Sequence, residues 1–467
     1  MKVVPLQKSG RKNDNLREVM LKLETGQLSS ISDEVTFSLS DLRPEDVSIL
    51  MEIIRLKSFG PGYIRELEKQ SANFVTEKLK QVHISRACIE AGDFDAVLSD
   101  HSGDKSHEDP ELVIQRARAQ CFMGRYSAGL DELNQLLNRT DLYTSTRGVA
   151  YQLGAQCLME LGDFESANGN LKMALQVAEV AGNRLGELAT RLFLSKCAVL
   201  EGDVSGASDH FTLALNQIAK TDESFRWLLG VYRTWGFTLF AESNVHCFEK
   251  MMIAFLLSSS IGDEVYSAKN SIEFLFMARA LLAPMTRELE ELLMERVSLG
   301  VQDTNDIKVW LDAYQSDAED ASWPESLKFL FRKVRATRGQ DGINLNQQDA
   351  VIRFQWFYRY LSGELSAHWI MDCDLGFLIS LTDKSHTPVK HNSPMIKLIE
   401  FLAHQEKPVE LEKCFEEAWG LKWNEEIHKN TLAVTLTRIN RRSCSYRIRR
   451  HGGMLSIDEP GLISRGI

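Results

Sequence analysis

The densest group of positive side chains is INRRSCSYRIRRHGG, from Ile439 to Gly453, which holds five arginines and no carboxylate. The wider window from Ile427 to Ile457 has seven Lys or Arg and no Asp or Glu. Because the whole chain has a formal net charge of −11, the residues outside this window carry −18. Folding does not require such a separation of charge, whereas a surface that approaches a polyphosphate does. The alternative interpretation is a solvated basic tail.

A helix predicted over IHKNTLAVTLTRINRR, 427–442, overlaps this stretch. Its Leu432, Leu436 and Ile439 share one face, and His, Thr and Arg at spacings of three and four line another. Arginine can contact guanine through two hydrogen bonds, and threonine can contact phosphate or a thymine methyl group, so this face suits the major groove of DNA. A predicted β-hairpin, SYRIRRHGGMLSI, adds arginines beside a Gly-Gly turn that can lie close to a sugar-phosphate strand. The candidate DNA-binding residues are His428, Thr431, Thr435, Arg438, Arg442, Arg447, Arg449 and Arg450.

Other polar clusters match no catalytic or metal site. Asp372 and Asp374 could be a metal pair, but neighbouring histidines have no spacing that places them on one helix face. The chain has no G-x-S-x-G, H-E-x-x-H, G-x-G-x-x-G or G-x4-G-K-[ST] motif. Its eight cysteines include no CxxC pair and no zinc-type Cys/His set. We therefore predict a protein that is not an enzyme and that has no cofactor, no metal and no disulfide framework.

An internal repeat organises the first half of the chain. The stretches EAGDFDA, CFMGRYSA, ELGDFESA and LEGDVSGA follow one another at intervals of 32, 38 and 40 residues. Each is flanked by amphipathic runs, for example 146–161 and 166–180, so each unit is predicted to be a helix hairpin. Glycines at 182 and 262 are predicted helix C-caps. A cysteine precedes each repeat glycine by three to five residues and is predicted to be buried: Cys88, Cys121, Cys157 and Cys197.

In the two clearest units the second helix has a small-x3-large-x2-small pattern, namely Ala167, Leu171, Ala174 and Ala207, Phe211, Ala214. This pattern resembles the tetratricopeptide repeat, over roughly residues 76–285. The resemblance implies a right-handed superhelix whose concave groove binds a protein, a peptide or a small ligand.

The C-terminal segments resemble a second family, the winged-helix DNA-binding domain of OmpR/PhoB-type response regulators. MIKLIEFLAH and LEKCFEEAWG are similar to its first two helices, including the Trp-Gly at 419–420, and LAVTLTRI is similar to its recognition helix. IRRHGGM resembles the wing pattern Arg-Gly-x-Gly-Tyr, with Arg450 and Gly453 in register, although His451 and Met454 replace the first glycine and the aromatic residue. No receiver pattern precedes the module, since the repeats occupy that place.

The predicted fold class is mainly α, with a tetratricopeptide-like superhelix followed by a small α/β winged helix-turn-helix domain. We expect an N-terminal helical cap over 1–75, the repeat domain over 76–345, a linker over 346–364 and the winged helix over 365–467. With 44% hydrophobic and 25% charged residues, a polar N-terminus and no long apolar stretch, the chain is expected to be globular, cytoplasmic and without a membrane partner.

The two resemblances imply a transcriptional regulator whose repeats bind a partner or ligand and whose winged helix contacts duplex DNA. The alternative is a non-enzymatic scaffold whose winged helix docks an acidic protein. A homodimer is compatible with either hypothesis. The cluster of arginines at 438, 442, 447, 449 and 450 distinguishes them, because only the first hypothesis requires these side chains to contact nucleic acid.

Overall fold

The computed structural model describes residues 93–99, 109–140, 144–218, 225–300, 305–337, 347–382, 385–388, 394–403, 407–442, 448–451, 454–457 and 461–464, and the single positions 82, 85, 88, 89, 142 and 405. The cap predicted over 1–75 lies outside these residues. Contacts divide the chain into two compact units, Met1–Val351 and Ile352–Ile467. The described residues are mainly helical and include two small β-sheets, as the fold-class prediction required at this coarse level.

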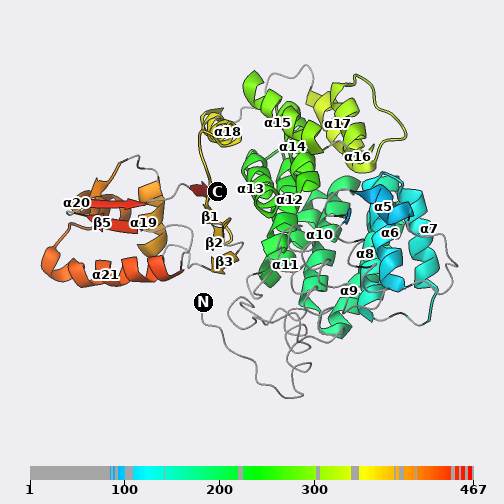
Figure 1. The fold of residues 1–467 in the computed structure, drawn as a ribbon, viewed down its shortest axis with the longest axis horizontal. Helices are drawn as coiled ribbons and strands as arrows, with labels where there is room; N and C mark the ends of the chain where they lie inside the picture. The colour runs from blue at the N-terminus through cyan, green and yellow to red at the C-terminus, as the bar shows by residue number, and fades with distance from the viewer. Residues whose placement is uncertain are drawn as a thin grey trace, which may run out of the picture. The chain divides into compact units, whose positions relative to one another are not determined.

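The described part of the first unit is helical (Figure 1). They are α5 (Phe94–Ser99), α6 (Pro110–Phe122), α7 (Tyr126–Leu137), α8 (Thr144–Leu161), α9 (Phe164–Ala181), α10 (Arg184–Glu201), α11 (Val204–Ile218), α12 (Phe225–Ala241), α13 (His246–Ile261), α14 (Glu264–Ala280), α15 (Arg287–Gly300), α16 (Asn305–Gln315) and α17 (Glu325–Thr337). The segment predicted as a linker, 346–364, contains a further helix, α18 (Gln347–Leu361), which crosses the boundary between the units.

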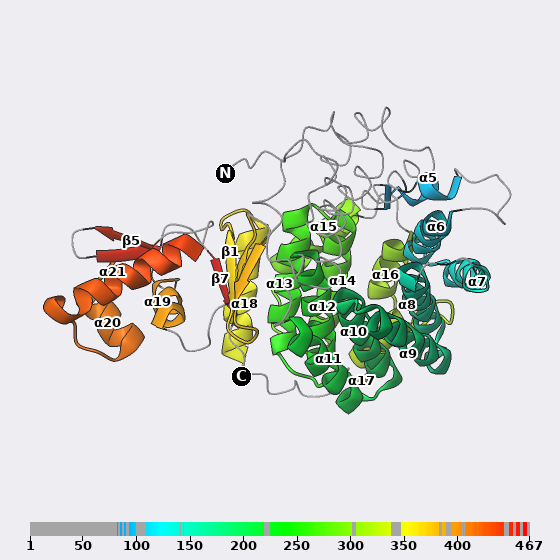
Figure 2. The same ribbon diagram turned by 90° about the horizontal axis from the view of Figure 1, so that it is seen from below.

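Neighbouring helices pair into hairpins, and the hairpins stack in sequence order. α6 contacts α7, α8 contacts α9, α10 contacts α11, and α12 contacts α13. The first helix of each hairpin also contacts that of the next, as α6 with α8, α8 with α10 and α10 with α12. Figure 2 shows these helices in a row. α17 also packs against α8, α10 and α14, and so contacts helices of three hairpins that precede it in the sequence.

The repeat glycines form the turns inside the hairpins. Gly124, Gly162 and Gly202 have φ angles of 72°, 84° and 91°, a left-handed conformation that a side chain disfavours. Gly182 and Gly262 end α9 and α13 in the same conformation, which confirms both as C-caps. Because each turn requires this left-handed conformation, the repeat can be recognised in the sequence by its regularly spaced glycines.

The small and large residues of the second helices are buried between hairpins, as the pattern predicted. Ala167, Leu171 and Ala174 are each 0% exposed, and the equivalent residues of α11 are also buried. Cys121, Cys157 and Cys197 are buried as well, with Cys121 Sγ 3.1 Å from Cys157 Sγ. Cys88 differs from the prediction because it is only half-buried.

Beyond α18, the described residues of the second unit form two sheets and three helices. The strands β1 (Trp369–Asp372), β2 (Phe377–Ser380), β3 (Ser385–Pro388) and β7 (Gly461–Ser464) form a sheet in the order β3-β2-β1-β7, antiparallel except for the parallel pair β1–β7. In register, Trp369 pairs with Ser380 and with Gly461. The sequence predicted a two-stranded hairpin at 369–389, whereas the structure has three consecutive strands there, β1, β2 and β3.

Between β3 and β7 the chain forms α19 (Pro394–Ala403), β4 (Val409–Glu410), α20 (Leu411–Trp419), α21 (Glu425–Arg442), β5 (Ile448–His451) and β6 (Met454–Ile457). The last two strands form a hairpin, and β4 adds to it in the antiparallel order β4-β6-β5. One apolar core joins both sheets and the helices, including Trp369, Leu398, Phe415, Leu432 and Leu455. Within the described residues, no helix is long and apolar enough to cross a membrane.

Candidate nucleic-acid interface and the cavity of the helical unit

The basic stretch lies on α21 and on the edge hairpin that contacts it. α21 is anchored by Leu432, which is 0% exposed, and by Leu436, which packs against the same core. The hairpin is anchored by Ile448 and Leu455, both of which belong to that core. The apolar residues predicted on one face of the helix thus fix its position, apart from Ile439, whose side chain is not described.

The predicted DNA-binding residues fall into two groups. The described ones are His428 and Thr435, half-buried on α21, and Arg449 and Arg450, exposed on β5. Thr431, Arg438 and Arg442 lie on α21, but their side chains are outside the described part, as is Arg447 altogether. The described residues therefore lie in one module, on α21 and on the β5–β6 hairpin, because β5 contacts α21.

The two arginines of β5 leave the strand in opposite directions, because successive side chains of a strand alternate between its faces. Arg450 shares a side with the buried Ile448, whereas Arg449 lies on the other side with His451. β5 is the edge strand of its sheet. The hairpin therefore presents a guanidinium group on each of its faces.

His428 has a structural contact that sequence reasoning missed. Its ring stacks on Phe415 at 5.0 Å between centroids, with 24° between the planes. Its Nδ1 accepts a hydrogen bond from the backbone N–H of Asn424 at 3.0 Å. The ring thus connects α20 to the N-terminal turn of α21. Its contact with DNA stays a prediction, for which Nε2 is the remaining ring nitrogen.

The pair Asp372 and Asp374 forms a turn. Asp372 Oδ1 accepts hydrogen bonds from the backbone N–H groups of Asp374 at 2.7 Å and of Leu375 at 2.9 Å. This pattern is an Asx-type turn between β1 and β2. Across the part of the chain that the structure describes, no group of three or more His, Cys, Asp or Glu side chains could hold a metal ion.

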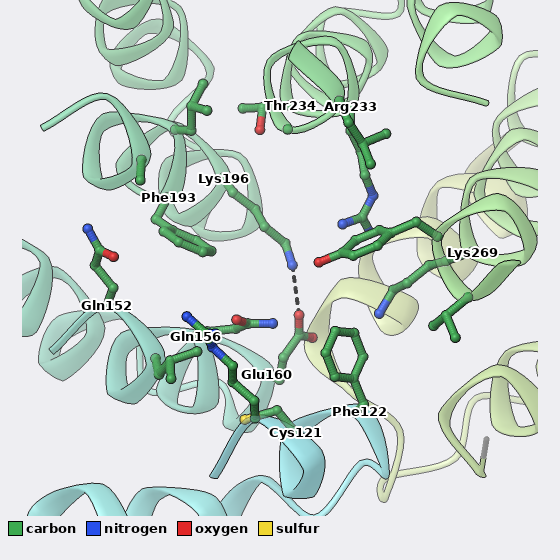
Figure 3. Close-up of a pocket in the computed structure, with 18 of the residues that line it drawn as sticks. Cys121, Phe122, Gln152, Gln156, Glu160, Phe193, Lys196, Arg233, Thr234 and Lys269 are labelled. Carbon is green, nitrogen blue, oxygen red and sulfur yellow. Dashed lines mark hydrogen bonds and ion pairs between the residues drawn. The ribbon is translucent and has the colours of Figure 1, made fainter. Parts of the chain in front are cut away.

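A second candidate site is a cavity of about 350 Å³ in the helical unit. Nearly all of its wall comes from the first helix of each hairpin, α6, α8, α10, α12 and α14. The close-up in Figure 3 shows polar and aromatic side chains from these helices directed toward one another. Sequence reasoning predicted a groove in the repeats but none of its residues. The sequence did contain one relevant signal. Gln152, Gln156 and Glu160 are spaced four residues apart, which places these polar side chains on one face of α8, and all three line the cavity.

Glu160 is a buried carboxylate at the centre of this cavity (Figure 3). Its Oε1 accepts from Lys196 Nζ at 2.8 Å, and its Oε2 accepts from Ser326 Oγ at 2.6 Å and Ser326 N at 3.1 Å. Burial alone would raise the pKa of Glu160, but the charges of Lys196 and Lys269 and the hydrogen bonds outweigh it and lower the pKa to about 2. Glu160 is therefore ionised at neutral pH and joins α8, α10 and α17.

Arg233 enters the same cavity from α12 (Figure 3). It forms a two-pronged ion pair with Glu273, with Nε 2.9 Å from Oε2. Its guanidinium also lies 5.8 Å from the ring centroid of Tyr266 and 5.9 Å from that of Phe237. Burial opposes the charge, yet the carboxylate of Glu273 raises the pKa of Arg233 above its usual range. The cavity therefore contains fixed, ionised groups that are held by neighbours.

We compared the chain with protein-family models, with curated proteins and with solved structures. None of the three comparisons found a match. The function is therefore inferred from the geometry and chemistry of the two sites.

Proposed function

We propose that this chain is a cytoplasmic transcriptional regulator. Its helical unit is a tetratricopeptide-like repeat domain that binds a partner or ligand, and residues 365–467 are a winged-helix domain of the OmpR/PhoB type that contacts duplex DNA. The observation that carries the proposal is the pair of exposed arginines, Arg449 and Arg450, on an edge hairpin in contact with α21. They belong to the window of seven positive and no negative side chains in a chain of net charge −11.

The order of elements in the second unit supports the winged-helix interpretation. Helix α19, the short strand β4, helices α20 and α21 and the β5–β6 hairpin follow one another, and β4 joins the hairpin in one sheet. The Trp-Gly sequence has a structural reason. Trp419 packs edge-on against Phe415 at 4.2 Å between centroids, and Gly420 ends α20 with a φ of 66°. A recognition helix beside a wing with guanidinium groups on both faces suits a major groove and the adjoining phosphate strands.

A second candidate function, a scaffold that docks an acidic protein, has its own supporting observation. Two large apolar side chains of the module are exposed: Val434 on α21 at 50% and Leu421 after α20 at 51%. Protein interfaces have an apolar core and are enriched in arginine, whereas phosphate contacts need only the charges. Both hypotheses predict binding of an anion, so the experiment must compare the two kinds of polyanion.

The test measures binding of the full-length chain to a fluorescent random-sequence duplex of about 25 base pairs and, separately, to fluorescent polyglutamate. A regulator binds the duplex more tightly, since groove geometry adds to charge, and Arg449→Ala/Arg450→Ala weakens duplex binding. The matched control is Arg287→Ala/Lys172→Ala, which removes two exposed positive charges from the helical unit instead. Tighter binding of polyglutamate, with no effect of the β5 variant on the duplex, would favour the scaffold.

A further inference from the structure

The cavity of the helical unit has walls that suit an apolar molecule. Aromatic and aliphatic side chains from four helices line it: Phe122, Leu153, Leu192, Phe193, Trp227 and Phe237. Its volume of about 350 Å³ lies near the lower end of the range for small-ligand pockets, roughly 300–1,000 Å³. The room therefore fits a small organic molecule, and the walls would bury its apolar body.

The charged side chains of the wall interact with other groups of the protein. Among the described residues they are Arg118, Glu160, Lys196, Arg233, Asp263 and Lys269. Glu160 and Lys196 pair with each other, and Arg233 pairs with Glu273. The other three side chains also have interactions within the protein. A charged ligand would have to lose its hydration and compete with these contacts, so the wall favours an uncharged ligand.

Gln115 provides an independent sign of a ligand. This side chain is 1% exposed and lines the cavity. Its Oε1 accepts a hydrogen bond from Arg118 at 3.3 Å, and because arginine has no acceptor atoms this contact fixes the orientation of the amide. Its Nε2 is buried and has no hydrogen-bond partner among the described residues. A buried N–H donor is costly without an acceptor, and a ligand oxygen would supply one.

We propose that this cavity binds a small uncharged molecule with an apolar body and a carbonyl group, whose oxygen accepts a hydrogen bond from Gln115 Nε2. This inference rests on the proposed function, in which the repeats bind a partner or ligand, and it names the chemical class of that ligand. A carbonyl oxygen only accepts, whereas a hydroxyl group also donates and would need an acceptor of its own. A peptide has an N–H donor for almost every carbonyl group, so it would need further acceptors as well.

The test uses the full-length chain and three fluorescent probes that share one aromatic body. Prodan is an uncharged ketone, dimethylaminonaphthalene has the same ring system without a carbonyl group, and dimethylaminonaphthoate has a carboxylate in its place. We expect prodan to bind at one site, at least about tenfold more tightly than either of the other two. Without a carbonyl group Gln115 Nε2 keeps no acceptor, and the carboxylate must give up its hydration.

Variants assign the carbonyl contact to Gln115. Gln115→Leu should lower the affinity for prodan about tenfold and leave that for dimethylaminonaphthalene unchanged, so that the ratio of the two affinities approaches one. Gln152→Leu is the matched control in the same wall, because Gln152 Nε2 already donates to Gly186 O at 3.1 Å and to Thr190 Oγ1 at 2.8 Å. It should keep the parent ratio, as should Gln135→Leu, whose parent side chain is exposed on α7. If Gln115→Leu fails to fold by circular dichroism, Gln115→Met replaces it.

Three results would overturn the inference. The first is prodan that does not bind, or binds no more tightly than either of the other probes. The second is a ratio that Gln115→Leu leaves unchanged or that Gln152→Leu abolishes equally. The third is displacement of prodan by the capped peptide N-acetyl-leucyl-leucinamide, which would indicate a peptide ligand.

The ligand inference and the proposed function can fail separately. Probe binding is measured without DNA, and duplex binding without probe. A failure of the ligand inference therefore leaves the DNA result standing, and a failure of the proposed function leaves the probe result standing.

Discussion

Glu160→Gln tests how the helical unit is held together. The substitution keeps the size of the side chain and removes the charge that Lys196 and Ser326 contact at 2.8 Å and 2.6 Å. These contacts join α8 to α10 and, across 166 residues of sequence, to α17. Lys196 would then be left largely buried without its carboxylate. Removing one partner of a buried pair costs about 3–5 kcal/mol, so the free energy of unfolding should fall by about that amount.

The pKa gives a second estimate of the same magnitude. Its fall from the ordinary value of 4.5 to about 2 corresponds to about 3 kcal/mol, since one pKa unit is worth ~1.4 kcal/mol. A carboxyl group whose pKa is lower in the folded state stabilises the fold above its unfolded pKa. This stabilisation is lost as the pH falls from about 4.5 toward 2. The difference in unfolding free energy between parent and Glu160→Gln should therefore be largest near neutral pH and shrink below about pH 4.5.

The assay is urea unfolding followed by far-UV circular dichroism, from about pH 7 down to about pH 3. The control is Glu179→Gln. Glu179 is 52% exposed and lies 3.7 Å from Arg191, so this surface pair contributes at most about 1 kcal/mol. A loss in Glu160→Gln no larger than in Glu179→Gln, or one that does not diminish in acid, would refute the assigned role of Glu160.

Three further predictions concern a turn, the buried thiols and the basic module. Gly262→Ala should lower the free energy of unfolding by about 1–2 kcal/mol, because Gly262 has a φ of 72° and an added Cβ meets no atom within 4 Å, so backbone conformation is the only cause. Thermal unfolding measures this loss, and an unchanged melting temperature would contradict the prediction. Cys157→Ser and Cys197→Ser should each cost about 1–3 kcal/mol, because both side chains are buried. Burial and the charge of Glu201 raise the pKa of Cys197 to about 11. Because neither thiol is accessible, both should react with a disulfide reagent only on unfolding. Arg438→Ala should weaken binding to a preferred DNA site by about 1–3 kcal/mol and reduce discrimination between sequences, whereas Arg450→Ala should weaken binding to all sequences equally. Titrations with two different duplexes measure this selectivity. If both variants change it equally, the two arginines have the same role.

The elements of the helical unit could be predicted from sequence because each depends on local chemistry. The glycines of the hairpin turns and the caps at Gly182 and Gly262 occupy left-handed conformations that favour this residue type. The alanines and the larger residues between them recur at helical spacing, and they are buried in the structure. The residues of the cavity were not predicted, because Gln115, Lys196 and Arg233 come together only after four hairpins, from α6–α7 to α12–α13, have stacked. The contact between Glu160 and Ser326 leaves no local signal for the same reason.

In the second unit, α20 and α21 were predicted to within a few residues. The amphipathic pattern of MIKLIEFLAHQEKPV predicted a helix from Met395 to Val409, whereas α19 ends at Ala403. The short strands β4 and β7 were missed. β4 has only two residues, and both strands exist through pairing with distant partners, Leu455 for Val409 and Trp369 for Gly461. The stacking of His428 on Phe415 was also unreadable, because a histidine on a polar helix face has the same pattern whether it contacts a neighbour or a ligand.

We propose that the surface formed by α21 and β5 binds nucleic acid, and the salt dependence of duplex binding by the full-length chain tests this claim. With four to seven cations displacing counterions, the plot of log affinity against log salt should have a slope of roughly −4 to −6. Arg449→Ala/Arg450→Ala should make that slope shallower by about two units, while Arg287→Ala/Lys172→Ala leaves it unchanged. No binding at about 50 mM salt, or a slope that the β5 variant does not alter, would contradict the claim.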